Sequence, residues 1–324
     1  MERSHVHTTP LPCGERGLFE EALNVPLCLV RGELSSSTRG QVGGGSNTSI
    51  PFLQSILRPR PAEGHKGTFG HALLVAGSYG MAGAGILAGR SCMRSGVGKL
   101  TVHIPQKNND IMQVALPEAI LHHDKDDKRW TSMPLDASVP ISYNAIGIGP
   151  GIGTGQETSE ALHRMLEAMA GTSIPMVLDA DALNILSEHP QWADMLPNGT
   201  IITPHPLEYR RLVEAGACMD NVILVLKGHP TTITIPGNPS VQYQCPYGNN
   251  GMGTAGSGDV LTGIILGLLA QGYPPRDAAL LGVGLHALSG DMAAGELGQH
   301  SLIASDLTKY LHKAFKRVSN EHKL

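Results

Sequence analysis

A glycine-rich turn that ends in a single carboxylate is the segment of this sequence best suited to chemistry. Residues 249–267 read NNGMGTAGSGDVLTGIILG, so glycines crowd the residues before Asp259 and a mostly apolar stretch follows it. Glycines let the backbone approach a phosphate closely, and free N–H groups at a helix N-terminus favour negative charge. A carboxylate repels a bound anion, so Asp259 suits a general base that deprotonates a hydroxyl attacking phosphorus. The structural alternative is an aspartate that stabilises the helix dipole.

Two further carboxylates, Asp179 and Asp181, directly follow an apolar run that ends at Leu178. Buried carboxylates need a cation or hydrogen-bond donors, because water no longer solvates their charge. The pair therefore indicates either a Mg²⁺ site or contacts to ligand hydroxyls. Asp181 has a second interpretation, as the N-cap of the helix that follows.

A histidine and a lysine follow two later apolar runs. His205 stands between Pro204 and Pro206, which restrict the backbone on both sides of the imidazole. A ligand contact and a purely structural role both remain open for it. Lys227 would supply a cation beside phosphates held at the turn before Asp259.

Two more glycine-rich stretches, residues 77–85 and residues 147–155, also follow apolar runs. The spacing of the first does not match the G-x-G-x-x-G fingerprint of dinucleotide-binding folds, so we reject that interpretation. It is either a turn that admits a substrate or a site of close helix packing. The second reads GIGPGIGTG and would bring backbone next to a flat or anionic ligand, although a plain strand-to-helix turn is the alternative.

The elements that position these residues alternate between short apolar strands and helices. This alternation predicts parallel β-α-β units, hence an α/β fold with a mainly parallel central sheet covered on both faces. Ligands bind such sheets at the carboxyl ends of the strands, where the candidate residues lie. Strands are predicted at His71–Gly77, Leu100–Ile104, Ala145–Ile148, Met176–Leu178, Thr200–Thr203, Val222–Leu226 and Thr231–Ile235. Helices are predicted at Ala82–Ser95, Asp110–Leu116, Thr158–Ala170, Ala182–Ser187, Leu207–Ala215, Val260–Ala270, Ala278–Ala294 and Leu307–Val318.

Composition argues against several classes of protein. The 324 residues carry a net charge of −4 and few aromatic side chains, so binding to nucleic acid or to an anionic membrane is not expected. No run of 18 apolar residues and no signal-peptide pattern occurs, which predicts a cytoplasmic protein. The five scattered cysteines fit a reducing compartment. His122 and His123, followed by Asp-Lys-Asp-Asp, are interpreted as a solvated loop.

The first 50 residues differ from the rest of the chain. They contain the linker-like runs SSST and GGGSNTS, and only Val25–Val30 could form a short strand. We therefore expect residues 1–50 to be disordered or loosely docked, and residues 51–324 to form one domain.

Several blocks, taken in order, resemble the ADP/ATP-dependent NAD(P)H-hydrate dehydratases, the carbohydrate-kinase-like repair enzymes of the ribokinase superfamily. The matching runs cover nearly all of residues 53–312. They are HKGTFGHALLVAGSYGMAGA, SGVGKLTVHIP, AIGIGPGIGT, MVLDADALN, TPHPLE, LKG and NNGMGTAGSGDVLTGIILGLLAQGY. The resemblance implies a ribokinase-like three-layer α/β/α fold.

The resemblance also implies roles for individual residues. Asp259 would be the catalytic base and would touch the hydrated nicotinamide, while Gly258 would contact the nucleotide phosphate. Three further residues would line the hydrate pocket: Ala84, Gly151 and His205. The residues that would border ADP or AMP are Lys227, Gly228, His229, Pro230 and Thr231.

The implied reaction is nucleotide-dependent dehydration of (S)-NAD(P)H hydrate to NAD(P)H, with ADP converted to AMP and phosphate. The implied cofactor is Mg²⁺, with ADP or ATP as co-substrate, and the implied assembly is a homotetramer. The sequence departs from the family pattern at Asn250, where proline is usual, in a short stretch at residues 213–221, and in lacking an N-terminal epimerase pattern. Two alternatives remain: a small-molecule kinase of the same superfamily, such as a vitamin-precursor kinase, and an inactive nucleotide-binding relative.

Overall fold

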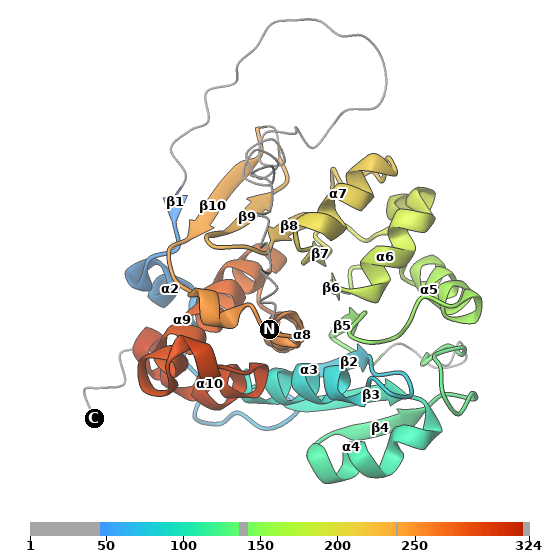
Figure 1. Ribbon diagram of the computed structural model, residues 1–324, viewed down its shortest axis with the longest axis horizontal. Coiled ribbons are helices and arrows are strands. Elements are labelled where there is room, and N and C mark those ends of the chain that lie inside the picture. The colour runs from blue at the N-terminus through green and yellow to red at the C-terminus, as the bar shows by residue number, and fades with distance from the viewer. Residues whose placement is uncertain (1–45, 136–141, 238, 320–324) are drawn as a thin grey trace, which may run out of the picture.

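The computed structural model describes residues 46–135, 142–237 and 239–319, which form one sheet covered by helices on both faces (Figure 1). The predicted three-layer α/β/α architecture is confirmed. The strands are β1 Ser46–Asn47, β2 His71–Val75, β3 Lys99–Ile104, β4 Ile120–His123, β5 Ala145–Ile148, β6 Met176–Leu178, β7 Ile201–Ile202, β8 Ile223–Leu226, β9 Thr231–Ile235 and β10 Val241–Cys245. The α-helices are α2 Ile50–Ile56, α3 Ala82–Arg94, α4 Asn109–Ala115, α5 Gln156–Met169, α6 Asp181–Glu188, α7 Pro206–Glu214, α8 Ser257–Ala270, α9 Pro275–Leu297 and α10 Ala304–Ser319.

The ten described strands follow the order β1-β10-β9-β8-β7-β6-β5-β2-β3-β4. Strand β9 is antiparallel to both of its neighbours, and every other described pair of neighbours is parallel. Strand β3 pairs with one side of β2, and β4 pairs with β3. The next strand along the chain, β5, pairs with the other side of β2. The order of the strands therefore reverses between β2 and β5, and ligands of open α/β sheets bind at such a point.

Two hydrophobic cores lie on the two faces of the sheet. One packs α2, α3, α4, α8, α9 and α10 against the strands, and the other packs α5, α6 and α7 against the opposite face (Figure 1). The central strands β2, β5 and β6 are almost fully buried, because helices cover both of their faces. Such strands read as continuous apolar runs, which explains why the sequence predicts them well.

Helices α3 and α8 approach each other closely through Gly263, so a side chain there is expected to destabilise the protein. A Cβ atom at Gly263 would overlap the Ala88 carbonyl oxygen and Ser91 Oγ on α3. We expect Gly263→Ala to lower the free energy of unfolding by about 1–3 kcal/mol, measured by urea denaturation. The matched control is Gly295→Ala in α9, where a Cβ meets no atom within 4 Å. That variant is expected to gain about 0.5–1 kcal/mol; an equal effect at both positions would contradict the packing argument.

Four elements were not predicted: β1, α2, β4 and β10. The interpretation of His122 and His123 as a loop is wrong, since both belong to β4, an edge strand that pairs with β3. Its mostly exposed side chains carry no apolar alternation, which is why the sequence pattern misses it. Residues 46–50, assigned above to the N-terminal segment, contribute β1 and the first residue of α2. The possible strand at Val25–Val30 lies outside the described residues.

Candidate active site

Asp259 lies in the first turn of α8, at the carboxyl edge of the sheet. The helix begins after Gly256, whose φ of +88° is a left-handed conformation that suits glycine. Within the described ranges, the N–H groups of Ala255, Gly256, Gly258 and Asp259 have no hydrogen-bond acceptor. Four free donors at a helix N-terminus can bind an anion, which is the role proposed for the glycine-rich turn.

His286, a residue that the sequence analysis did not select, supports the start of α8. Its ring lies in α9, with Nε2 3.0 Å from the Ser257 carbonyl oxygen and 3.3 Å from Ser257 Oγ. Burial lowers the pKa of His286 to about 4, so the imidazole is neutral at pH 7 and donates to the carbonyl from Nε2. Only its position within the apolar face of a long helix could have indicated this role.

The turn before α8 is also anchored to α9, through Asp291. The Asp291 carboxylate accepts hydrogen bonds from Gly248 N–H and Asn249 Nδ2, both at 2.9 Å. Asn249 Oδ1 in turn accepts from Gly251 N–H at 3.0 Å. Asn250, the departure from the family pattern, begins a short 3₁₀ turn within this arrangement.

Asp179 and Lys227 form an ion pair beneath the turn. Lys227 Nζ is 2.7 Å from Asp179 Oδ1 and 3.8 Å from Glu208 Oε2, and Thr262 Oγ1 donates to Asp179 Oδ2 at 2.8 Å. Burial lowers the pKa of Lys227, but Asp179 and Glu208 outweigh it and raise the pKa overall, so the ammonium stays charged. Asp179 is therefore satisfied by Lys227 and Thr262, neither of which the sequence analysis assigned to it.

Asp181 connects the same edge to the glycine-rich stretch after β5. It is the first residue of α6, and its Oδ2 accepts a hydrogen bond from Gly153 N–H at 2.8 Å. The N-cap position belongs to Ala180, so the N-cap interpretation of Asp181 is wrong. Ala180 has a φ of +48°, a positive value found at no other non-glycine residue in the described part of the chain. Such strain persists where the surrounding structure enforces it, often at active sites.

The charges around Asp259 prepare it to accept a proton near neutral pH. Burial is the largest cause that raises its pKa, the nearby Asp179 carboxylate raises it further, and Lys227 lowers it. The result is a pKa of about 7. A general base is most effective with its pKa near the working pH, so this environment matches the predicted role.

A cavity of about 580 Å³ opens beside the N-terminus of α8. It brings together several residues predicted to bind the nucleotide, namely Lys227, Gly228, His229, Thr231 and Gly258, while Pro230 is not in its lining. Its apolar wall includes residues that the sequence analysis did not select: Tyr247, Met252, Leu261, Val283 and Ala287. An apolar wall facing a cation and free N–H groups suits a ligand with a flat base and a phosphate.

His205 lines the same cavity and is held in place by the helix that follows it. Its Nδ1 accepts hydrogen bonds from Leu207 N–H (3.1 Å) and Glu208 N–H (3.2 Å). Glu208 Oε2 accepts from the His205 N–H at 2.8 Å, completing a capping box at the start of α7. The cap, and not the two prolines alone, therefore orients the imidazole. Helix α7 ends at Glu214, so the short stretch at residues 213–221 is mainly a connection to β8.

Ala84 and Gly151 lie together on the other side of Asp259, at the point where the strand order reverses. A Cβ atom at Gly151 would be 3.1 Å from Ala84 Cβ, and Gly151 has a φ of +62°. The Gly151 carbonyl accepts a hydrogen bond from Ser78 N–H at 2.6 Å, which joins the two glycine-rich stretches. Leu87, one turn further along α3, lies against Gly256. Ala84 and Gly151 thus lie on one side of the start of α8 and the predicted nucleotide residues on the other, whereas His205, also predicted to line the hydrate pocket, lies with the nucleotide residues.

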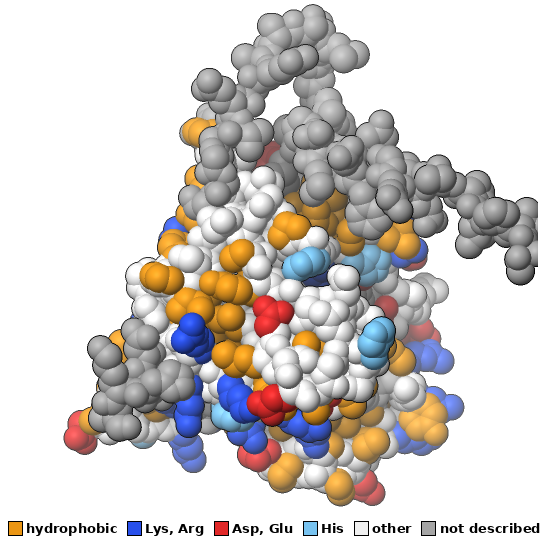
Figure 2. All heavy atoms as spheres, turned by 60° about the vertical axis from the view of Figure 1, so that its left-hand side comes forward, with side chains coloured by type: hydrophobic (Ala, Val, Ile, Leu, Met, Phe, Trp, Pro, Cys, Tyr) orange, Lys and Arg blue, Asp and Glu red, His pale blue; other side chains and the backbone are white. Residues whose placement is uncertain are grey.

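A larger cavity of about 740 Å³ lies away from these residues, among α2, the C-terminal part of α8, and α10. Figure 2 brings this side of the molecule forward and shows apolar side chains next to Lys and Arg side chains. None of the predicted site residues lines the cavity. Among the described residues, no helix is long and apolar enough to cross a lipid bilayer.

Comparison with known proteins gives consistent matches. A family model described as NAD(P)H-hydrate dehydratase matches residues 72–313. The chain is 34% identical to the ADP-dependent (S)-NAD(P)H-hydrate dehydratase of Bacillus subtilis, over 83% of this chain and 99% of the relative. It is 35% identical to the bifunctional NAD(P)H-hydrate repair enzyme Nnr of Moorella thermoacetica, over 83% of this chain and 54% of the relative. The chain thus spans about half the length of this bifunctional relative.

The fold comparison agrees with the sequence comparison. The crystal structure of the ADP/ATP-dependent NAD(P)H-hydrate dehydratase from Bacillus subtilis, co-crystallised with ATP and Mg²⁺, superposes with a TM-score of 0.71 at 30% identity. The alignment covers 85% of this chain and 99% of that chain. The likeness therefore extends over both sides of the site described above.

Proposed function

The chain belongs to the NAD(P)H-hydrate dehydratase family, and we propose that it dehydrates (S)-NAD(P)H hydrate to NAD(P)H while converting ADP to AMP and phosphate. One observation carries the proposal: Asp259, with its pKa of about 7, shares the first turn of α8 with free N–H groups. The names of relatives such as the Bacillus subtilis enzyme supply the nicotinamide hydrate as substrate.

The geometry suggests how each residue acts. Asp259 takes the proton from the C6 hydroxyl of the hydrate, and the hydroxyl oxygen attacks the terminal phosphorus of ADP. The bond from that phosphorus to the bridging oxygen breaks, and AMP leaves. The free N–H groups of Ala255, Gly256 and Gly258 and the Lys227 ammonium stabilise the charge that develops on the phosphoryl oxygens. The ring nitrogen then expels phosphate from C6, and loss of a proton from C5 to solvent re-forms the C5–C6 double bond of NAD(P)H.

Mg²⁺ is part of the proposal as a partner of the nucleotide. Among the described residues, no group of three or more His, Cys, Asp or Glu side chains could hold a metal ion. Asp179, the strongest candidate ligand, is already paired with Lys227 and Thr262. Mg²⁺ commonly binds through one or two carboxylates together with substrate phosphates, and Asp181 fits that mode. When bound, the ion would neutralise phosphate charge.

The direct test mixes the protein with (S)-NADH hydrate, Mg²⁺ and either ADP or ATP, and follows absorbance at 340 nm. Recovery of NADH that requires a nucleotide is expected, and the effective nucleotide identifies the phosphate donor. A stable phosphorylated product in place of NADH would instead favour a small-molecule kinase. Thermal stabilisation by ADP without release of phosphate would indicate an inactive nucleotide-binding relative.

The pH dependence of the reaction should report the titration of Asp259. Its carboxylate is the active form, so kcat/KM is expected to rise with pH and to reach half of its maximum near pH 7. At pH 6 the rate should be about a tenth of the plateau, because about a tenth of the carboxyl groups are ionised. A profile that stays flat between pH 5.5 and pH 8 would contradict Asp259 as the base.

Assembly and location complete the proposal. We retain the homotetramer that the family resemblance implies and the cytoplasmic location that the sequence predicts. Light scattering of the purified protein tests the first, and fractionation of cells tests the second.

A further inference from the structure

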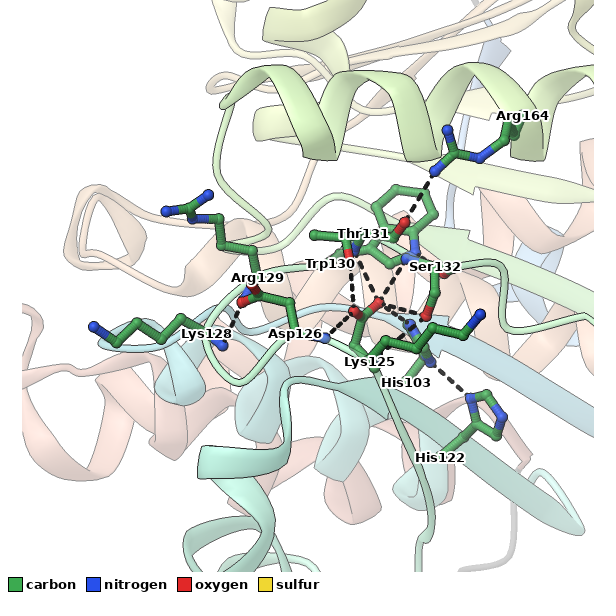
Figure 3. Close-up of polar contacts among 11 residues, drawn as sticks. His103, His122, Lys125, Asp126, Lys128, Arg129, Trp130, Thr131, Ser132 and Arg164 are labelled. Carbon is green, nitrogen blue, oxygen red and sulfur yellow. Dashed lines mark hydrogen bonds and ion pairs between the residues drawn. The ribbon is translucent and has the colours of Figure 1, made fainter.

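A buried carboxylate, Asp124, organises the loop that follows β4. Asp124 is 4% exposed, and its oxygens accept hydrogen bonds from His103 Nε2 (2.9 Å) and from the N–H and hydroxyl groups of Thr131 and Ser132 (2.8–3.0 Å). Asp126 N–H adds another at 2.8 Å. Burial raises the pKa of Asp124, but these hydrogen bonds outweigh it and hold the pKa below its usual range. Figure 3 shows this network closing the loop.

Hydrogen bonds within the loop fix the backbone of two cationic residues, Lys128 and Arg129. Asp126 Oδ1 accepts hydrogen bonds from the backbone N–H groups of Lys128 (2.7 Å) and Arg129 (2.9 Å). The Lys128 carbonyl accepts from Tyr79 N–H at 2.8 Å, which docks the loop onto the turn after β2. The side chains of Lys128 and Arg129 point to the side opposite His103 and His122 (Figure 3). The backbone that carries both cations is thus well ordered, although their side chains are exposed.

These side chains line a cavity of about 330 Å³ beside the predicted hydrate pocket. The other lining residues are Ser78, Tyr79, Ile152, Gly153, Gly155 and Thr158, so the lining contains no carboxylate. The cavity begins directly after Gly151, because Ile152 and Gly153 follow it and Ser78 N–H donates to its carbonyl. Arg129 is paired with Glu157 at 2.9 Å, but both side chains are more than half exposed. Such an exposed pair is weak and can exchange for a better anion.

We propose that Lys128 and Arg129 bind the phosphate groups of the dinucleotide portion of NAD(P)H hydrate. The inference rests on the proposed function, which places the nicotinamide end beside Ala84 and Gly151. The diphosphate of the substrate carries two negative charges, and the groups around Asp259 include the further carboxylates Asp179 and Asp181. Lys227 is already paired with Asp179. The cations in the cavity next to Gly151 would therefore balance the charge of the diphosphate.

The test compares the double variant Lys128→Gln, Arg129→Gln with Lys107→Gln. Lys107 is an exposed lysine that pairs with Asp127 at 3.5 Å but does not line the cavity. We expect the double variant to raise KM for the hydrate about tenfold, with kcat and KM for ADP unchanged. The KM of the natural chain should also rise with salt, and that of the double variant should rise less.

Binding of NADPH, followed by its fluorescence, provides a readout that needs no turnover. NADPH carries the same diphosphate, so the double variant should bind it about tenfold more weakly while Lys107→Gln binds it normally. Unchanged KM and unchanged NADPH affinity in the double variant would overturn the inference. Absence of NADH formation by the natural chain would instead count against the proposed function. The NADPH affinities of the natural chain and the double variant would then be the test of the inference.

Discussion

Replacing Asp259 with asparagine is expected to lower kcat by about 10²–10⁴-fold, because the variant cannot accept the proton of the attacking hydroxyl. The change preserves size and leaves the N–H groups of α8 in place, so KM for ADP should change little. The 340 nm assay measures the loss. The matched control is Asp277→Asn, which alters an aspartate in the first turn of α9 that pairs with Arg276. Activity of the Asp259 variant within tenfold of the natural chain would contradict the assignment.

The stability of the same variant separates chemistry from folding. Burial raises the pKa of Asp259 from its usual value to about 7, so the folded protein favours the protonated form. The stability contributed by this group is present below the unfolded pKa and is lost as pH rises through about 7. Asparagine stays neutral, so the variant should unfold at an equal or higher temperature than the natural chain at pH 8. An inactive variant with a lowered Tm would indicate damage to the fold.

Replacing Lys227 with methionine is expected to impair both catalysis and folding. The variant would leave Asp179, which is 1% exposed, without its cation, so the free energy of unfolding should fall by about 3 kcal/mol in urea denaturation. Loss of the ammonium beside the phosphates should lower kcat/KM for ADP on the order of 10²-fold. Because Lys227 lowers the pKa of Asp259, the pH profile should also shift upward.

A second substitution tests whether the loss of stability in Lys227→Met comes from the unpaired charge of Asp179. The double variant Lys227→Met, Asp179→Asn removes the buried charge that Lys227 neutralises. It should recover much of the lost stability but none of the lost activity. If stability does not recover, the ion pair between Lys227 and Asp179 does not account for the loss.

Many of the predicted elements follow from local patterns. Strands β2, β5 and β6 are short apolar runs, and the turn before Asp259 is recognisable by its closely spaced glycines. The edge of the sheet was harder to predict. Strand β1 pairs with Tyr243 and Gln244 of β10, nearly two hundred residues away, and neither strand is apolar enough to be recognised alone. Strand β4 is similar, since its residues are mostly exposed.

The candidate active site likewise combines residues that the sequence indicates with contacts that it does not. Asp179 and Lys227 stood out because each follows an apolar run, and Asp259 because it ends a glycine-rich turn. Their mutual arrangement did not, because the ion pair joins residues 48 positions apart in the chain. His286 was not selected, and the interpretation of Asp124 as part of a solvated loop is wrong because its side chain is buried, since a single buried polar residue carries no periodic signal. Their partners come from other elements that only the folded chain brings near.

The sequence by itself determined most of the strands and helices and the reactive side chains near their ends, because hydrophobic periodicity and glycine spacing act over a few residues. Only the tertiary structure decided that Lys227 neutralises Asp179, that His286 supports the start of α8, and that Lys128 and Arg129 face the strand ends. These contacts depend on strand order and helix packing, and the free energies that select them arise between residues distant in the chain.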